Sequence, residues 1–226
     1  MTTSLVSLLL RVLPLALGAA LSPVILALQM VMLTTGKRRP LRAWLVVLGA
    51  AAACCIWVAV GLFIVNRMPH PASGPDPTAA ALRIAMALVL ASLGAHVLYH
   101  RTPDTPPSQA AGSSGDAPAH LGRALLLGFV AMVSNLSSLV LFLPALHEIT
   151  HSRTDDMDKS IVLGVLILIT LLPALVPPLA AAIGGAGARG ALDRLSAVIA
   201  AHHTMVNATI CFVFALYLLV TGLLRL

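Results

Sequence analysis

The sequence contains the spacing H-E-x-x-H at His147, Glu148 and His151. On a helix, histidines four residues apart share one face and can bind zinc, with the glutamate as the general base of a hydrolase. A catalytic zinc ion needs a third protein ligand. The candidates for that ligand are Asp155, Asp193 and His202. The favoured alternative is that the three motif residues are interfacial groups at a helix end, because a polar segment, 147–159, begins there.

Polar residues inside otherwise apolar runs form a second candidate site. Proline lacks a backbone N–H and disfavours helical geometry in the residue before it, so Leu21-Ser22-Pro23 predicts a break, as does the polar run 134–138. A broken helix exposes backbone donors and carbonyls, and the N-terminus of its second half favours an anionic group. We predict a substrate-binding site made of Ser22, Pro23, Gln29, Ser134, Asn135, Ser137, Ser138, His203 and Asn207. The alternative is that the serines only cap the freed backbone.

One face of the last apolar run carries His203, Asn207 and Cys211, which recur every four residues. This stripe is either a polar wall of a cavity or a packing face with one satisfied histidine. Acidic residues are scarce, and none is predicted at the centre of an apolar run, which disfavours a relay of intramembrane carboxylates. We therefore predict no catalytic residue, no resident metal and no cofactor outside the zinc alternative.

The composition indicates the solvent in which these residues lie. Of 226 residues, 59% are hydrophobic and only 10% are charged, against about 25% in soluble domains. A helix needs roughly 20 apolar residues to cross a bilayer, so we predict an all-α integral membrane protein with about six transmembrane helices. Pro14 and the break at Ser22 are predicted to divide the first. The predicted spans are 4–35, 43–66, 79–99, 121–146, 160–183 and 204–224.

The charge pattern predicts the partners and the membrane. The net charge is +6, but the basic residues lie at the ends of apolar runs, which indicates membrane topology and lipid head groups rather than nucleic acid. The densest basic loop is 37–42, after the first span. The positive-inside rule then predicts a multi-pass protein of the cytoplasmic (inner) membrane with both termini outside.

The two halves of the chain have similar patterns. We predict a first three-helix repeat at 1–99, a flexible linker at 100–120 rich in proline, serine and glycine, and a second repeat at 121–226. Each half begins with a broken span and has a glycine near its far end, Gly94 and Gly222. Three spans per half require the second repeat to enter the membrane inverted, as in many transporters. The alternative is that prolines and small residues only allow close helix packing, including at a homodimer contact.

Several of these segments together resemble a known family. They are Ala20 to Ile25, the basic loop, Gly49, Asn135 to Leu139, Pro144 to Ile149, and Leu172-Pro173. The pattern resembles the lysine-exporter (LysE) superfamily, and within it the GAP or sulfolipid-addressing-protein (Sap) family. Ser137 stands where that family often has the lysine of an N-x-K-N-L-like turn, so no role inferred for that lysine carries over.

The resemblance implies a function as well as a fold. It implies a membrane transport protein, not an enzyme, that helps to translocate or export a cell-envelope lipid, glycolipid or other small amphiphilic solute, often beside a larger lipid exporter. It also implies the inverted three-plus-three arrangement. The alternatives are export of a small metabolite or metal ion, as in the wider superfamily, and an intramembrane zinc hydrolase that uses His147, Glu148 and His151.

Overall fold

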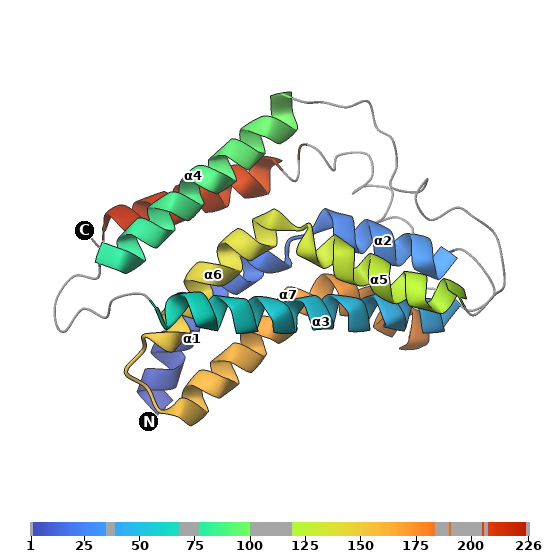
Figure 1. Cartoon of the computed structure of the whole chain (residues 1–226), viewed down its shortest axis with the longest axis horizontal. Helices are drawn as coiled ribbons and strands as arrows, with labels where there is room; N and C mark the ends of the chain where they lie inside the picture. Colours follow the sequence, from blue (N-terminus) through green and yellow to red (C-terminus); the bar gives the residue numbers. More distant parts are fainter. Residues whose placement is uncertain are drawn as a thin grey trace.

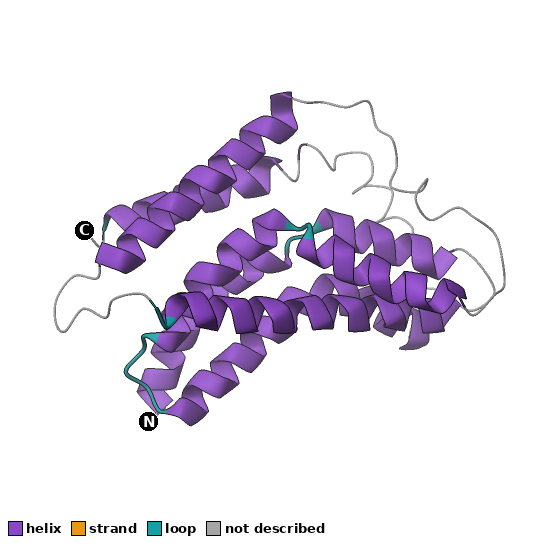
Figure 2. Ribbon diagram, viewed as in Figure 1, coloured by secondary structure: helices purple, strands orange, loops and turns teal. Residues whose placement is uncertain are grey.

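Helices make up the regular structure of every described part of the chain (Figure 1 and Figure 2). The computed structural model describes residues 2–34, 39–67, 77–99, 119–183, 190, 205 and 208–224. The helices are α1 (Thr2–Ala20), α2 (Pro23–Thr34), α3 (Arg39–Val65), α4 (Pro77–Tyr99), α5 (Ala119–Val133), α6 (Leu136–Thr150) and α7 (Asp156–Ile183). A further helix, Ala208–Leu223, follows near the C-terminus and is called the terminal helix.

Three helices, α3, α4 and α7, are long and apolar enough to cross a membrane. Two bent pairs qualify if each pair counts as one span: α1 with α2, bent by 54°, and α5 with α6, bent by 65°. The described residues therefore hold up to five spans. The terminal helix is apolar but shorter, and the predicted start of the sixth span at 204 lies outside the described residues. The prediction of a helical membrane protein is thus supported, with three to five spans.

Three predicted details of the helices are wrong. α1 continues through Pro14, and its only break in this span is at Leu21 and Ser22. One proline removes a single donor, which does not end a helix that is packed on its neighbours. α6 runs on to Thr150, so the polar segment expected at 147–159 is reduced to 151–155. α5 begins at Ala119, inside the expected linker, whose residues 100–118 are not described.

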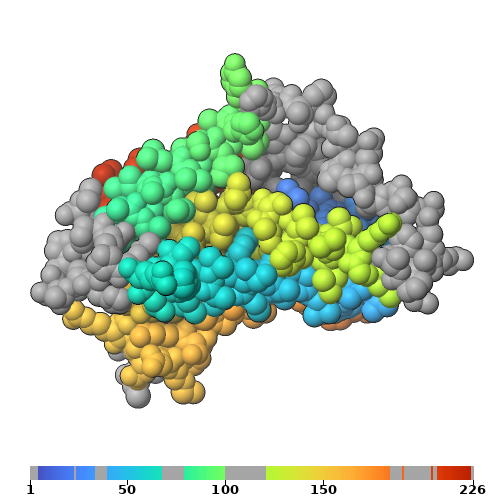
Figure 3. All heavy atoms as spheres, in the orientation of Figure 1, coloured from blue at the N-terminus to red at the C-terminus, as the bar shows by residue number. Residues whose placement is uncertain are grey.

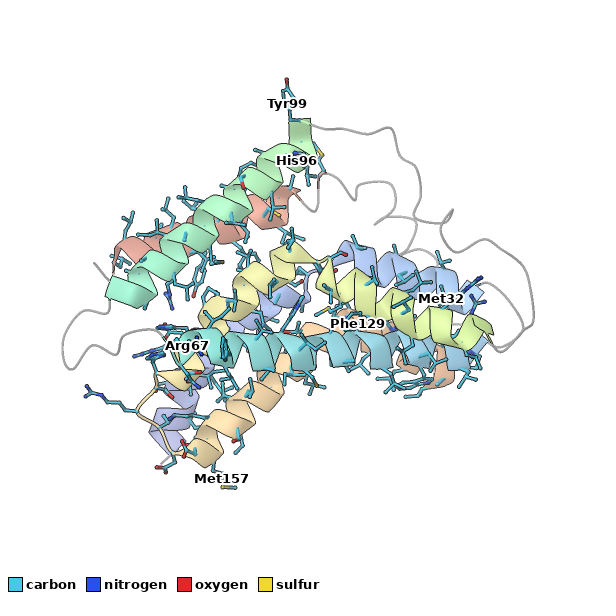
Figure 4. All side chains as sticks on the ribbon, in the orientation of Figure 1. Met32, Arg67, His96, Tyr99, Phe129 and Met157 are labelled. Atoms are coloured by element: carbon cyan, nitrogen blue, oxygen red, sulfur yellow. The ribbon has the colours of Figure 1, made fainter. Side chains whose placement is uncertain are left out.

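Glycines on α3 and α5 bring these two helices into backbone contact. A Cβ atom on Gly49 of α3 would overlap the carbonyl oxygen of Leu125, and one on Gly128 of α5 would overlap the carbonyl oxygen of Val46. Small residues permit such close approach, which membrane helices use because water does not drive their association. Beside this contact, Met32 of α2 is buried against Val46 (Figure 4).

α4 and the terminal helix lie side by side at one edge of the molecule (Figure 1 and Figure 3). A Cβ atom on Gly94 of α4 would lie 3.1 Å from Cβ of Cys211, and one on Gly222 would lie 2.9 Å from Ile84. The two contacts show that the helices are antiparallel, since the end of each faces the beginning of the other. Each helix thus presents one glycine to its partner.

The contacts among the other helices recur in pairs. α1 packs on α7 as α5 packs on α3, and α1 packs on α6 as α5 packs on α2. In the same way α2–α7 corresponds to α6–α3, and α2–α3 corresponds to α6–α7. Exchanging α1, α2 and α3 with α5, α6 and α7 therefore converts each of these contacts into another one. The contact α3–α7 maps onto itself, and α4–α6 is not part of this exchange.

We expect Gly49→Ala to weaken the contact between α3 and α5, because its methyl group has no space beside Leu125. Overpacking of this kind lowers the free energy of unfolding by roughly 1–3 kcal/mol. Gly164→Ala on α7 is the matched control, since nothing lies within 4 Å of its new methyl group. Thermal unfolding in detergent measures both. Equal stability of the two variants would contradict the backbone contact.

Candidate functional site at the helix breaks

The two helix breaks meet in space, and their side chains form one hydrogen-bonded network. Asn135 donates through Nδ2 to Oγ of Ser22 at 2.8 Å and to Oγ of Ser138 at 2.7 Å. Ser138 donates to the carbonyl oxygen of Ala19 at 2.6 Å, and Ser137 donates to Oδ1 of Asn135 at 2.9 Å. We call this network of five residues the break junction. Figure 2 shows the two connecting segments next to each other near the centre of the molecule.

Local sequence explains both breaks. Ser22 is the N-cap of α2, since its hydroxyl accepts the N–H of Ile25 at 3.4 Å. Pro23 is the first residue of α2, a position where its missing N–H is not needed. Asn135 occupies the N-cap position of α6 but makes no side-chain cap bond, since its Oδ1 accepts the hydroxyl of Ser137 while its Nδ2 donates across to Ser22. Ser22 therefore caps the backbone freed at its own break, and Asn135 joins the two breaks; the role of these residues in substrate binding stays a prediction.

The break junction is neutral, but two helix N-termini point into it. None of its side chains is ionisable, and α2 and α6 both begin there. Helix N-termini carry partial positive charge and free N–H groups, which favour an anionic or strongly polar group. Ser22 and Ser138 are almost completely buried, at 2% and 1% exposure, whereas Asn135 and Ser137 are half-buried and Ser134 is exposed. These polar side chains thus extend from the buried interior to the surface of the protein.

The structure places the other predicted site residues differently. Gln29 is on α2 but takes no part in the break junction, and no side-chain hydrogen bond of Ser134 is seen among the described residues. His203 and Asn207 lie outside the described residues. The described part of the predicted site therefore divides into the break junction and a separate position at Gln29.

Gln29 supplies a hydrogen bond that α7 lacks. Its side chain is completely buried, and Nε2 donates to the carbonyl oxygens of Ala174 at 2.9 Å and Ala43 at 3.2 Å. In an α-helix the carbonyl of Ala174 would accept the N–H of residue 178, but Pro178 has none. The Gln29 amide therefore takes the place of that missing donor and holds α2 against the proline-containing part of α7.

His147 and Glu148 of the H-E-x-x-H motif are buried within α6, whereas His151 is half-buried and is the C-cap residue of this helix. Glu148 accepts a 2.7 Å ion pair from Nη2 of Arg83 on α4, and the two side chains are only 6% and 5% exposed. The rings of His147 and His151 stack with centroids 4.2 Å apart. Among the described residues no group of three histidine, cysteine or acidic side chains is placed to hold a metal ion. Asp155 is exposed, and the other two candidate ligands are not described.

Sequence analysis missed the ion pair between Arg83 and Glu148. The sequence predicts Arg83, like the other basic residues, only as a charge at the end of an apolar run. The available signal was one arginine inside an apolar run, since ionisable residues within membrane helices are usually paired and functional. Nothing in the local sequence identified Glu148 as its partner, because the two residues are 65 positions apart and their helices meet only in the folded protein.

A pocket of about 230 Å³ opens near the same end of α6. Half of its lining residues are apolar, and the polar ones come from the end of α6 and the first turns of α7. The lining residues are Leu62, Leu146, Ile149, Thr150, Asp156, Lys159, Ser160 and Leu163. Met157 projects outward from α7 beside this region (Figure 4).

We expect Glu148→Gln to lower the free energy of unfolding by roughly 3–5 kcal/mol, because it leaves the buried Arg83 charge without its counter-ion. The double variant Arg83→Met, Glu148→Met should recover much of this loss, since no buried charge then remains. The control is Lys159→Met, which breaks the exposed 3.4 Å pair with Asp156 and should change thermal unfolding little. A Glu148→Gln variant as stable as this control would contradict the buried pair.

Gln29→Leu should also destabilise the protein, by roughly 1–3 kcal/mol, because the carbonyl of Ala174 is left without its side-chain donor. In a Pro178→Ala background the same substitution should cost less, since residue 178 then has an N–H for that carbonyl. Thermal unfolding of the four proteins gives the coupling energy. An equal cost in both backgrounds would show that Gln29 does not replace the missing donor.

Comparison with known families gives one match. The family model described as Sap, sulfolipid-1-addressing protein, matches residues 12–224, which include both breaks and α3 to α7. No curated protein and no solved structure matches significantly. Because the family model covers nearly the whole chain, this protein belongs to the Sap, sulfolipid-1-addressing protein, family.

Proposed function

We propose that this protein helps to translocate a lipid or another amphiphile across its membrane, and that the break junction binds the polar head of the transported molecule. The observation that carries the proposal is the polar network of Ser22, Asn135 and Ser138 between two facing helix breaks. The family description, which names a sulfolipid-1-addressing protein, supports a role in lipid transport.

The surroundings of the break junction suit an amphiphile. Large apolar side chains next to both breaks are exposed on the outer surface of the helices: Leu21, Val24, Val133 and Leu136. A polar head could be bound by hydroxyl and amide groups and by the N-termini of α2 and α6, while its chains remain in contact with lipid beside these residues. The transported head would enter from the half-buried side, at Asn135 and Ser137.

We further propose that residues 1–99 and 121–226 are inverted repeats. The paired helix contacts, and the mutual glycine contacts of α4 and the terminal helix, support a two-fold relation between the halves. Such a relation would allow the break junction to be reached from either side in turn. This proposal also includes the resemblance to the LysE superfamily and a location in the cytoplasmic membrane with both termini outside. It includes a larger lipid exporter as partner as well. The homodimer stays a prediction.

Translocation of a fluorescent phosphatidylglycerol in phosphatidylcholine vesicles tests this function. We expect vesicles with the protein to move the probe between leaflets faster than empty vesicles. Asn135→Leu with Ser138→Ala should slow the movement at least tenfold, since each lost hydrogen bond to the head group weakens its binding by roughly 1 kcal/mol. Ser92→Ala on α4 is the control, because its exposed hydroxyl bonds only to its own helix. Equal rates for the double variant and the control would remove the break junction as the site.

A further inference from the structure

An aromatic side chain of the terminal helix lies against the break junction. A Cβ atom on Gly18 would be only 2.5 and 2.7 Å from ring carbons of Phe214 and 2.8 Å from a methyl group of Leu141. Gly18 immediately precedes Ala19, whose carbonyl oxygen accepts the hydroxyl of Ser138. The Phe214 ring can therefore reach the backbone of α1 beside the break only because residue 18 has no side chain.

Phe214 is one of the contacts of the terminal helix with the rest of the protein, beside Ala215 and Leu218, which belong to the main apolar core. Its ring is half-buried and meets the ring of Tyr217 edge-on, with centroids 6.5 Å apart. The same turn of the terminal helix carries the exposed apolar side chains of Val213 and Leu216. The ring thus lies beside both the break junction and an exposed apolar surface.

α4 and the terminal helix pack on each other and, through Leu90 and Leu218, on the main apolar core of the protein. Their glycines Gly94 and Gly222 each lie against the other helix. Among the labelled helices, the main contact of α4 is with α6, and it includes the ion pair between Arg83 and Glu148. Gly222 of the terminal helix lies against Arg83 of α4. Because Arg83 is paired with Glu148, it joins both helices of the pair to α6. Phe214 lies eight residues, or about 12 Å, along the terminal helix from that point.

We propose that the seam between this helix pair and the broken helices α1 and α6 is a lateral portal for an acyl-chain amphiphile, and that Phe214 closes it. Movement of the helix pair about the anchored end at Arg83 would withdraw the ring from Gly18. An acyl chain has the same apolar character as the ring and can replace it in the seam, which leaves the head group next to Ser138 and Asn135. The portal rests on the proposed function, because it gives the route by which a lipid enters that site.

Access to the break junction can be measured without transport. In a background with the native cysteines replaced by alanine, Ser138→Cys serves as a reporter for a lipid-soluble maleimide. We expect Phe214→Ala to speed labelling at least tenfold and Phe214→Trp to slow it. Leu216→Ala, an exposed position on the same helix, should leave the rate unchanged. The thermal unfolding temperature of each variant shows whether it is folded. Equal labelling rates of the Ser138→Cys reporter with Phe214, Phe214→Ala and Phe214→Trp would overturn the portal.

Cross-linking then tests whether opening of the seam is needed for translocation. A short bifunctional thiol reagent bridges Gly18→Cys to Phe214→Cys across the seam, in a background where the native cysteines are alanine. The control joins Gly94→Cys to the native Cys211 within the helix pair, where the two Cβ positions are 3.1 Å apart. We expect the first bridge to stop movement of the fluorescent phosphatidylglycerol and the second to leave it intact.

The two measurements separate the two proposals. Translocation that continues with the seam bridged would overturn the portal while leaving the proposed function in place. Wild-type protein that does not move the probe in vesicles would contradict the proposed function, and the labelling rates of the Phe214 variants would still decide whether the seam opens beside Phe214.

Discussion

The constraint on which this structure depends is that a helix broken inside a membrane must satisfy its freed backbone groups within the protein, because lipid offers no hydrogen bonds. At the break junction the carbonyl of Ala19 receives the hydroxyl of Ser138, and the N–H of Ile25 is capped by Ser22. Asn135 donates to both serine hydroxyls and so joins the two breaks in one hydrogen-bonded network. The first break is therefore satisfied by its own Ser22 and by Ser138 of the second break, which requires the two halves of the chain to meet at this point.

The same requirement explains other features of the packing. Pro178 leaves one carbonyl of α7 without its helical donor, and a glutamine from α2 supplies the bond. Helices also have to be held together without help from water, and here glycines bring their backbones into direct contact at Gly49 and Gly128. Arg83 and Glu148 are stable inside the protein only as a pair, because either charge alone would be costly to bury.

Helices are joined here in more than one way. α3 and α5 are joined backbone to backbone, and α2 is fastened to α7 through Gln29. α4 and the terminal helix contact the broken helices through the ion pair of Arg83 and the ring of Phe214, beside apolar side chains that belong to the main core. A polar site between broken helices, apolar flanks that face lipid and a covering helix pair are the components that lateral entry of an amphiphile requires, and they all follow from packing a helical chain in lipid.

The sequence by itself determined that the chain is helical and apolar, that its helices break at Leu21–Ser22 and at 134–135, and which family it belongs to, because hydropathy, proline and turn residues act locally. It did not determine that α1 continues through Pro14 or that α6 continues past Glu148 to Thr150. Only the tertiary structure decided that Glu148 pairs with Arg83, that Gln29 serves Ala174, and that Asn135 reaches Ser22. In each case the partner is far away in the chain, and which polar groups become neighbours depends on how whole helices pack.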